Sequence, residues 1–161
     1  MRSFSWSEGL SRAYHEAGHA LAGYRLGLRV ISSTLPAIGG GGETSIDFEG
    51  DHRKEVLVAF AGMHCQIHFD QRHSTTVDWD RERYDDSASD RSDAKRTAEL
   101  LAREQHGTTE CDVLLALSYE SQILVQANDD WPRIERFAND LYDKHHLDEA
   151  DISRLFLEDG G

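Results

Sequence analysis

The chain has 161 residues, of which 39% are hydrophobic, and this length fits one domain with a buried core. Its formal net charge of -13 disfavours nucleic acid and anionic membrane surfaces as partners. No stretch approaches the roughly 20 apolar residues of a membrane span, and the N-terminus lacks the apolar run of a signal peptide. We therefore expect a single domain over residues 1–161, without a membrane segment and located in the cytoplasm.

The first predicted elements are a helix and a pair of strands. Over residues 7–26, apolar side chains recur at steps of three and four, which indicates one helical face, and Gly27 follows as a C-terminal stop. Residues 28–35 are rich in β-branched types, and residues 44–48 alternate between polar and apolar, so each is predicted as a strand. The glycines at 39–42 would join these strands in a hairpin.

The rest of the chain is predicted to be helical, apart from one long loop. Residues 53–69 carry apolar side chains at helical spacing, whereas residues 70–91 are polar, acidic and without a clear period. A short C-terminal helix is predicted from about Asp148. Three further helices are predicted between the loop and that helix, over residues 92–105, 109–127 and 130–144. The fold class is therefore predicted to be mainly α with a small β-hairpin element.

A metal-binding motif lies on the first predicted helix, where residues 15–19 read His-Glu-Ala-Gly-His. The four-residue spacing places His15 and His19 on one face, one turn apart, so both imidazoles can bind one metal ion. Zinc accepts His nitrogens at about 2.0–2.1 Å. Glu16 would lie beside the metal, where it could move a proton from a zinc-bound water to a leaving amine. We predict that His15 and His19 bind Zn2+ and that Glu16 is the general base.

Gly18 is costly in a helix, by about 1 kcal/mol relative to Ala, so we expect it to pack closely against another backbone.

Residues 13–23 (AYHEAGHALAG) resemble the zinc motif of the FtsH-type, AAA-linked membrane metalloproteases. The likeness continues in the strand pair after the motif, in residues 57–62 (LVAFAG) of a second helix, in the segment from Ser92, and in the C-terminal helices over 134–155. It implies an FtsH-like peptidase domain with the zinc motif on the N-terminal helix. It also implies a zinc metalloendopeptidase that hydrolyses peptide bonds of unfolded or flexible polypeptides.

A catalytic zinc site needs a third protein ligand and an open position. By the resemblance, this ligand is Asp93, at the start of the helix predicted over 92–105. Asp90 and Asp86 are competing candidates, because the acidic segment over 78–90 departs from the family in length and charge.

Other features of the sequence leave alternatives open. This chain has Gln66-Ile67 where the family has an acidic pair, and the histidines His64, His68 and His73 cluster nearby. His64 and His68 have ligand spacing, so a second or inhibitory metal site competes with an interpretation as partly buried or surface histidines. The alternative function is a catalytically silent zinc-binding regulatory or peptide-binding module on the same fold. A zinc hydrolase acting on non-peptide amides is a further possibility.

The chain has no Walker loop, because the glycines at 39–42 lead into Glu43-Thr44 and not into Gly-Lys-Ser/Thr. We therefore expect an ATP-independent peptidase, or a subunit that works with a separate ATPase or as a homo-oligomer. An extended polypeptide substrate would pair with the edge of the strand at 44–48.

Overall fold

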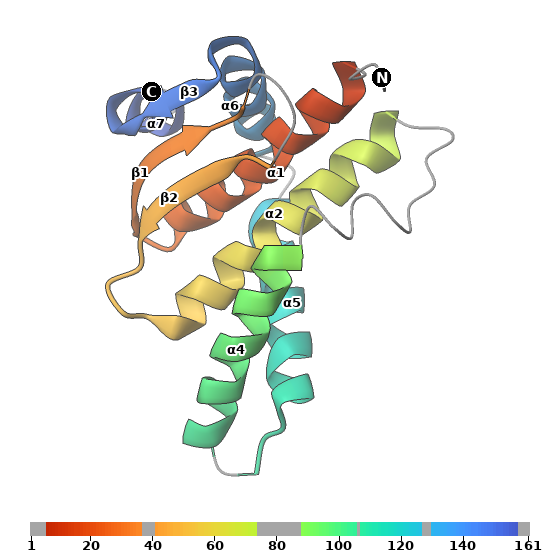
Figure 1. Cartoon of the computed structure of the whole chain (residues 1–161), viewed down its shortest axis with the longest axis vertical. Coiled ribbons are helices and arrows are strands. Elements are labelled where there is room, and N and C mark those ends of the chain that lie inside the picture. The colour runs from red at the N-terminus through yellow and green to blue at the C-terminus, as the bar shows by residue number, and fades with distance from the viewer. Residues whose placement is uncertain (1–5, 37–40, 74–87, 106, 127–129, 158–161) are drawn as a thin grey trace.

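A computed structural model describes residues 6–36, 41–73, 88–105, 107–126 and 130–157 of the chain. In these ranges helices predominate, and a small antiparallel sheet lies beside them (Figure 1). None of the helices described is long and apolar enough to cross a membrane. The predicted fold class, mainly α with a small β element, is confirmed at this level.

The motif helix α1 (Trp6–Arg25) packs along helix α2 (His52–His73). Gly18 allows the close approach, because a Cβ at this position would lie 2.5 Å from the Ala61 carbonyl oxygen and 2.7 Å from Cys65 Cβ. The expectation that Gly18 packs against another backbone is therefore confirmed. This contact fixes which residues of α2 face the motif.

The sheet has the strand order β2-β1-β3. Strand β1 (Arg29–Thr34) pairs antiparallel with β2 (Glu43–Asp47), which confirms the predicted hairpin, and its register shifts between Val30 and Ser32. It also pairs antiparallel with β3 (His146–Asp148), a strand that the sequence did not predict. Strand β2 is consequently an edge strand of this sheet.

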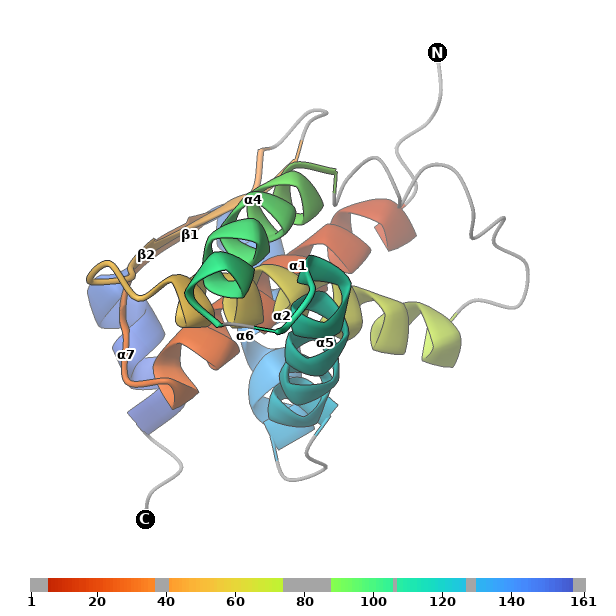
Figure 2. The same ribbon diagram turned by 90° about the horizontal axis from the view of Figure 1, so that it is seen from below.

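The remaining helices pack around α1 and α2. Helices α4 (Ala88–Glu104) and α5 (Glu110–Gln126) run side by side against α2, as Figures 1 and 2 show from two directions. Helix α6 (Trp131–Lys144) packs on α1, and α7 (Glu149–Leu157) lies against β1 and β3. Helices α5, α6 and α7 begin within one residue of their predicted starts, whereas α4 begins earlier than predicted.

The structure differs from the prediction at both ends of the long loop predicted over residues 70–91, whose residues 74–87 lie outside the described part of the chain. Helix α2 continues to His73, and helix α4 begins at Ala88, four residues before its predicted start. Asp90 therefore lies in the first turn of α4 and not in a loop. This earlier start decides which acidic side chain reaches the motif.

Helix α1 is buried on several sides and so forms a firm support for the motif. Its residues Ala13, Ala17 and Leu21 are fully buried in the largest hydrophobic cluster, which also contains Phe137 and Leu141 of α6. A second cluster joins α2 to α4 and α5. Because α2 takes part in both clusters, it links the motif helix to the helix that carries Asp90.

Candidate metal centre

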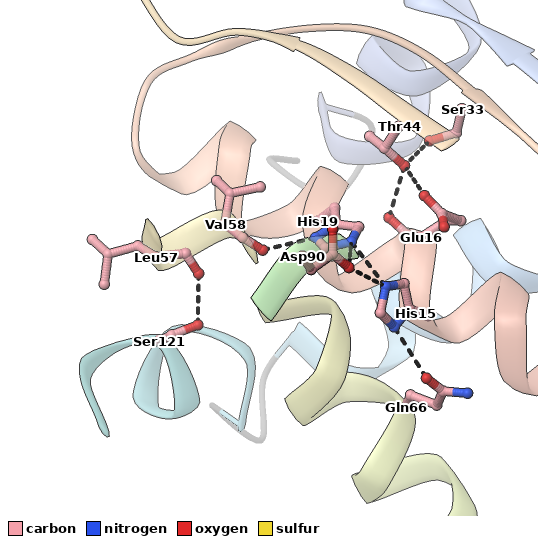
Figure 3. Close-up of polar contacts among 10 residues, drawn as sticks. All are labelled: His15, Glu16, His19, Ser33, Thr44, Leu57, Val58, Gln66, Asp90 and Ser121. Atoms are coloured by element: carbon pink, nitrogen blue, oxygen red, sulfur yellow. Dashed lines mark hydrogen bonds and ion pairs between the residues drawn. The ribbon is translucent and has the colours of Figure 1, made fainter. Parts of the chain in front are cut away.

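Three side chains from two distant segments converge beside α1 (Figure 3). His15 Nε2 lies 3.0 Å from His19 Nε2 and 2.9 Å from Asp90 Oδ2, and His19 Nε2 lies 3.3 Å from the same Asp90 oxygen. Within the described residues, these three side chains form the group whose donor atoms could hold one metal ion. Two ligands at 2.0–2.1 Å from a tetrahedral ion are about 3.3 Å apart, so the three atoms are near the separations that zinc requires.

The outer nitrogens of both imidazoles fix the direction in which the inner nitrogens face. His19 Nδ1 is 2.7 Å from the Val58 carbonyl oxygen, and His15 Nδ1 is 3.0 Å from Gln66 Oε1. Both oxygens only accept hydrogen bonds, so each Nδ1 donates a proton and each Nε2 presents a lone pair to the centre. Two lone pairs and a carboxylate oxygen at such distances repel one another unless a cation joins them. A proton can serve as this cation, and so can a divalent metal ion, so the donor set fits zinc.

The charges around the centre favour a cation there. Burial lowers the pKa of His19, but the hydrogen bond to Asp90 and the charges of Glu16 and Asp90 outweigh it and raise the pKa to about 9. Burial would raise the pKa of Asp90, but the two imidazoles hold it well below its usual range. The same acidic groups that retain a proton on His19 would attract a metal ion, so protons and metal compete for one place.

Gly62 on α2 makes room for the two imidazoles. A Cβ at this position would lie 2.5 Å from His19 Cε1, 2.6 Å from His19 Nε2 and 2.9 Å from His15 Nε2. Val58, Gly62 and Gln66 follow one another at steps of four residues, so they lie on one face of α2. On this face the Val58 carbonyl oxygen accepts from His19, Gly62 leaves room for both rings, and the Gln66 amide oxygen accepts from His15.

We expect Gly62→Ala to lower the zinc affinity by about 100-fold, because the added methyl group displaces both rings from geometry that metal ligands require. Competition with a chromophoric chelator measures this affinity. Gly41→Ala is the matched control, because an added Cβ there meets no atom of the described residues within 4 Å. Equal zinc affinities for the two variants would show that Gly62 does not set the position of the rings.

Glu16 lies beside the centre and is held by the start of β2. Thr44 Oγ1 donates a hydrogen bond to Glu16 Oε2 at 2.6 Å, and Ser33 Oγ is 2.8 Å from Thr44 Oγ1 (Figure 3). A Cβ on Gly42 would lie 2.7 Å from Glu16 Cγ. The Glu16 carboxylate is therefore buried, oriented by a hydroxyl group and outside the group of possible ligands.

We expect Thr44→Val to lower kcat of peptide hydrolysis about tenfold without changing the zinc affinity. The substitution removes a hydrogen bond to a charged group, which is worth about 1.5–3 kcal/mol, and keeps the shape of the side chain. Steady-state cleavage of a peptide and chelator competition measure the two quantities. Thr34→Val is the control, since the Thr34 hydroxyl bonds His146 at the other edge of β1. A loss of zinc affinity in Thr44→Val would contradict a role confined to Glu16.

The structure brings Asp90, one of the two competing candidates, to the histidines. Asp93, which we expected as the third ligand, lies three residues further along α4 and is exposed. It lines both cavities beside the motif but is not part of the converging group. Asp86, the other candidate, lies outside the described residues. The structure thus places Asp90, and not Asp93, against the two imidazoles, while metal binding and the identity of the third ligand stay predictions.

The histidines of α2 contact different neighbours. His64 Nε2 is 3.1 Å from Ser118 Oγ of α5, whereas the His68 ring lies edge-on against Trp131 at 4.5 Å between ring centres. Burial lowers the pKa of both side chains. No second group of three or more possible metal ligands occurs in the described ranges. These contacts favour the interpretation as partly buried structural histidines.

Two cavities meet at the candidate metal centre. One has a volume of about 410 Å³ and the other about 510 Å³, and both border His19, Thr44 and Asp90. The smaller lies between β2, α2 and α4, and the larger reaches His15, Glu16 and Gln66. Space for a substrate therefore lies next to both Glu16 and the possible ligands.

The sequence alone did not identify Gly62 or Thr44 as parts of the site. A signal for Gly62 exists in retrospect, because glycine in a helix is unfavourable and Gly62 is four residues before the buried polar Gln66. Thr44 gives no comparable signal, since a threonine in a strand is ordinary. Its role depends on where β2 meets α1, which the local sequence does not specify.

No protein-family model matches the chain, and no curated protein matches it. The candidate centre therefore rests on its own geometry: two histidines on one turn of a helix, a carboxylate from a second helix and a buried glutamate beside them. The two histidines and the carboxylate are a donor set that could hold a metal ion.

Proposed function

We propose that this protein is a zinc-dependent endopeptidase with an FtsH-like peptidase fold. The observation that carries the proposal is the convergence of His15, His19 and Asp90 within 4.8 Å, with Glu16 buried next to them. Two His and one carboxylate form a known donor set of catalytic zinc sites, which leave one position open. Glu16 speaks for catalysis, because a purely structural site does not require a fourth, non-ligating carboxylate.

When bound, zinc supplies a Lewis acid and lowers the pKa of a water to about 7. The residues of the chain would supply the remaining functions. Glu16 accepts the proton of the attacking water and delivers it to the leaving nitrogen. Thr44 keeps the Glu16 carboxylate in position through the 2.6 Å hydrogen bond, so that little reorganisation is needed during the reaction.

The surroundings of the site suit an extended peptide. Strand β2 is an edge strand, and its residue Thr44 lines the smaller cavity together with Phe48, which directly follows β2, Val58 of α2 and Ala94 of α4. A substrate strand that pairs with β2 would pass the centre and place apolar side chains against this wall. Such a substrate must be unfolded or flexible, and a separate ATPase would be a means of supplying unfolded chains. A homo-oligomer is the other assembly in which the chain could work.

The test is cleavage of fluorescently labelled, unfolded casein by three preparations of the protein: zinc-loaded, metal-stripped, and stripped protein to which zinc is returned. We expect cleavage by the first and third and none by the second. Cleavage that persists after stripping would sink the proposal. Bound zinc without any cleavage would favour the catalytically silent zinc-binding module, on the same donor set.

A further inference from the structure

A buried chain of hydrogen bonds extends from His15 away from the candidate centre, between α1 and α2. His15 Nδ1 is 3.0 Å from Gln66 Oε1, Gln66 Nε2 donates to Ser11 Oγ at 3.1 Å, and Ser11 Oγ donates to Asp70 Oδ1 at 3.0 Å. Ser11, Gln66 and Asp70 are at most 6% exposed. Polar groups buried in this way must be hydrogen-bonded, so each member constrains the next.

The donor and the acceptor in each of these hydrogen bonds follow from the number of protons available. The Ser11 hydroxyl has one proton and donates it to Asp70, so its oxygen accepts from Gln66. The amide of Gln66 must then turn its nitrogen to Ser11 and its oxygen to His15. That oxygen only accepts, so His15 Nδ1 must carry a proton and Nε2 must be the lone pair that faces His19 and Asp90.

The positions of the four residues on α1 and α2 explain how these hydrogen bonds can form. Ser11 and His15 are one turn apart on α1, and Gln66 and Asp70 are one turn apart on α2. The close contact of the helices at Gly18 sets these two pairs opposite each other. His19 differs from His15 in this respect, because its Nδ1 is held by the backbone oxygen of Val58. His15 alone of the two depends on a side chain that can rotate.

We propose that Ser11, Gln66 and Asp70 are positioning residues that hold His15 in the Nδ1-protonated form, with Nε2 directed to the metal. In this interpretation Gln66 is a functional substitute for an acidic residue, and not a loss of support for the centre. The hydroxyl of Ser11 and the carboxylate of Asp70 are required because they prevent the Gln66 amide from turning over. The inference rests on the proposed zinc site but concerns the orientation of one imidazole.

The experiment compares the wild type with Gln66→Met and Ser11→Ala, and uses Gln122→Met as the control. Gln66→Met keeps the length of the side chain and removes the oxygen that accepts from His15. Ser11→Ala removes the hydroxyl group that fixes the Gln66 amide, and alanine has a higher helix propensity than serine. The Gln122 side chain bonds Gln126 on the surface of α5, far along the chain from the motif. Chelator competition gives the zinc affinity, and long-range 15N–1H spectra of the imidazole rings in the metal-stripped proteins give the tautomer of His15.

We expect the zinc affinity to fall about 10- to 100-fold in Gln66→Met, as for other partners that orient metal-binding histidines, and several-fold in Ser11→Ala. The spectra should show a proton on His15 Nδ1 in the wild type and in the control, and a loss of this preference in Gln66→Met. Ser11→Ala should show a mixture of tautomers. If Gln66→Met does not fold, Ser11→Ala carries the test.

Two results would overturn the inference. One is a wild-type zinc affinity in both variants, and the other is an unchanged Nδ1 proton on His15 when Gln66 or Ser11 is replaced. A wild-type protein that binds no zinc would count against the proposed function instead. In that case the tautomer of His15 in the same four proteins still decides whether the chain of hydrogen bonds orients this ring.

Discussion

Glu16→Gln should lower the rate of casein cleavage at least about 1,000-fold and leave the zinc affinity within about twofold of the wild type. General acid–base catalysis contributes roughly 100- to 10,000-fold to enzyme rates, and an amide cannot accept and return the proton. Glutamine has the shape of glutamate and can still accept the hydrogen bond of Thr44. Glu16 is also not among the three side chains whose donor atoms converge, so the metal should stay in place.

The measurement runs labelled casein with equal concentrations of zinc-loaded wild type and variant, and determines bound zinc in each sample. Glu104→Gln is the control, because Glu104 is exposed at the end of α4 and lines neither cavity. It should cleave at nearly the wild-type rate. Equal cleavage by wild type and Glu16→Gln would point to a contaminating protease and remove Glu16 from the mechanism.

The motif and the helices around it could be predicted because their signals are local. His15 and His19 are related by one helical turn, and the periodic apolar residues that surround them define α1 and α2. The β1–β2 hairpin was predicted from alternation and from the glycines between the strands. Strand β3 was missed, since three residues between two helices form a strand only because β1 offers them a partner.

The acidic ligand could not be chosen from the sequence for a different reason. Asp90 and Asp93 are three residues apart, so both lie on the side of α4 that borders the cavities. The first turn of this helix is polar, and no apolar period indicates that it starts at Ala88. Only the packing of α4 on α2 determines that Asp90, and not Asp93, reaches the two imidazoles.

Gln66 stands where the family has an acidic residue, and the sequence alone did not indicate which side chains it contacts. The structure places its amide oxygen 3.0 Å from His15 Nδ1 and its nitrogen 3.1 Å from Ser11 Oγ. These contacts depend on the register between α1 and α2, which the contact at Gly18 sets and which the sequence of α2 by itself does not contain.

Asp90→Ala should lower the zinc affinity about 100- to 1,000-fold, whereas Asp93→Ala should change it less than about threefold. Zinc in a protein is held by roughly 10–16 kcal/mol in total, so the loss of one of three ligands removes a substantial part. Asp90 Oδ2 is within 3.3 Å of both imidazole nitrogens, and Asp93 is exposed. Chelator competition at pH 8 measures both variants. A larger loss of zinc affinity in Asp93→Ala than in Asp90→Ala would show that Asp93 is the third ligand.

The pH dependence gives a second test of Asp90. Because Asp90 and Glu16 raise the pKa of His19 to about 9, a proton competes with zinc below this pH, and the wild-type affinity for zinc should rise until about pH 9.

Without metal, the raised pKa of His19 stabilises the fold at pH values below the unfolded pKa of about 6.5, and this contribution is lost as the pH rises through about 9. Burial lowers the pKa of His19, and Asp90→Ala removes the hydrogen bond and the charge of Asp90 that oppose this effect. The pKa of His19 therefore falls in the variant, and the stripped variant should lose less stability than the wild type between pH 6.5 and 9. Urea unfolding of both stripped proteins at these two pH values measures the difference, and parallel changes would mean that Asp90 does not face His19 in solution.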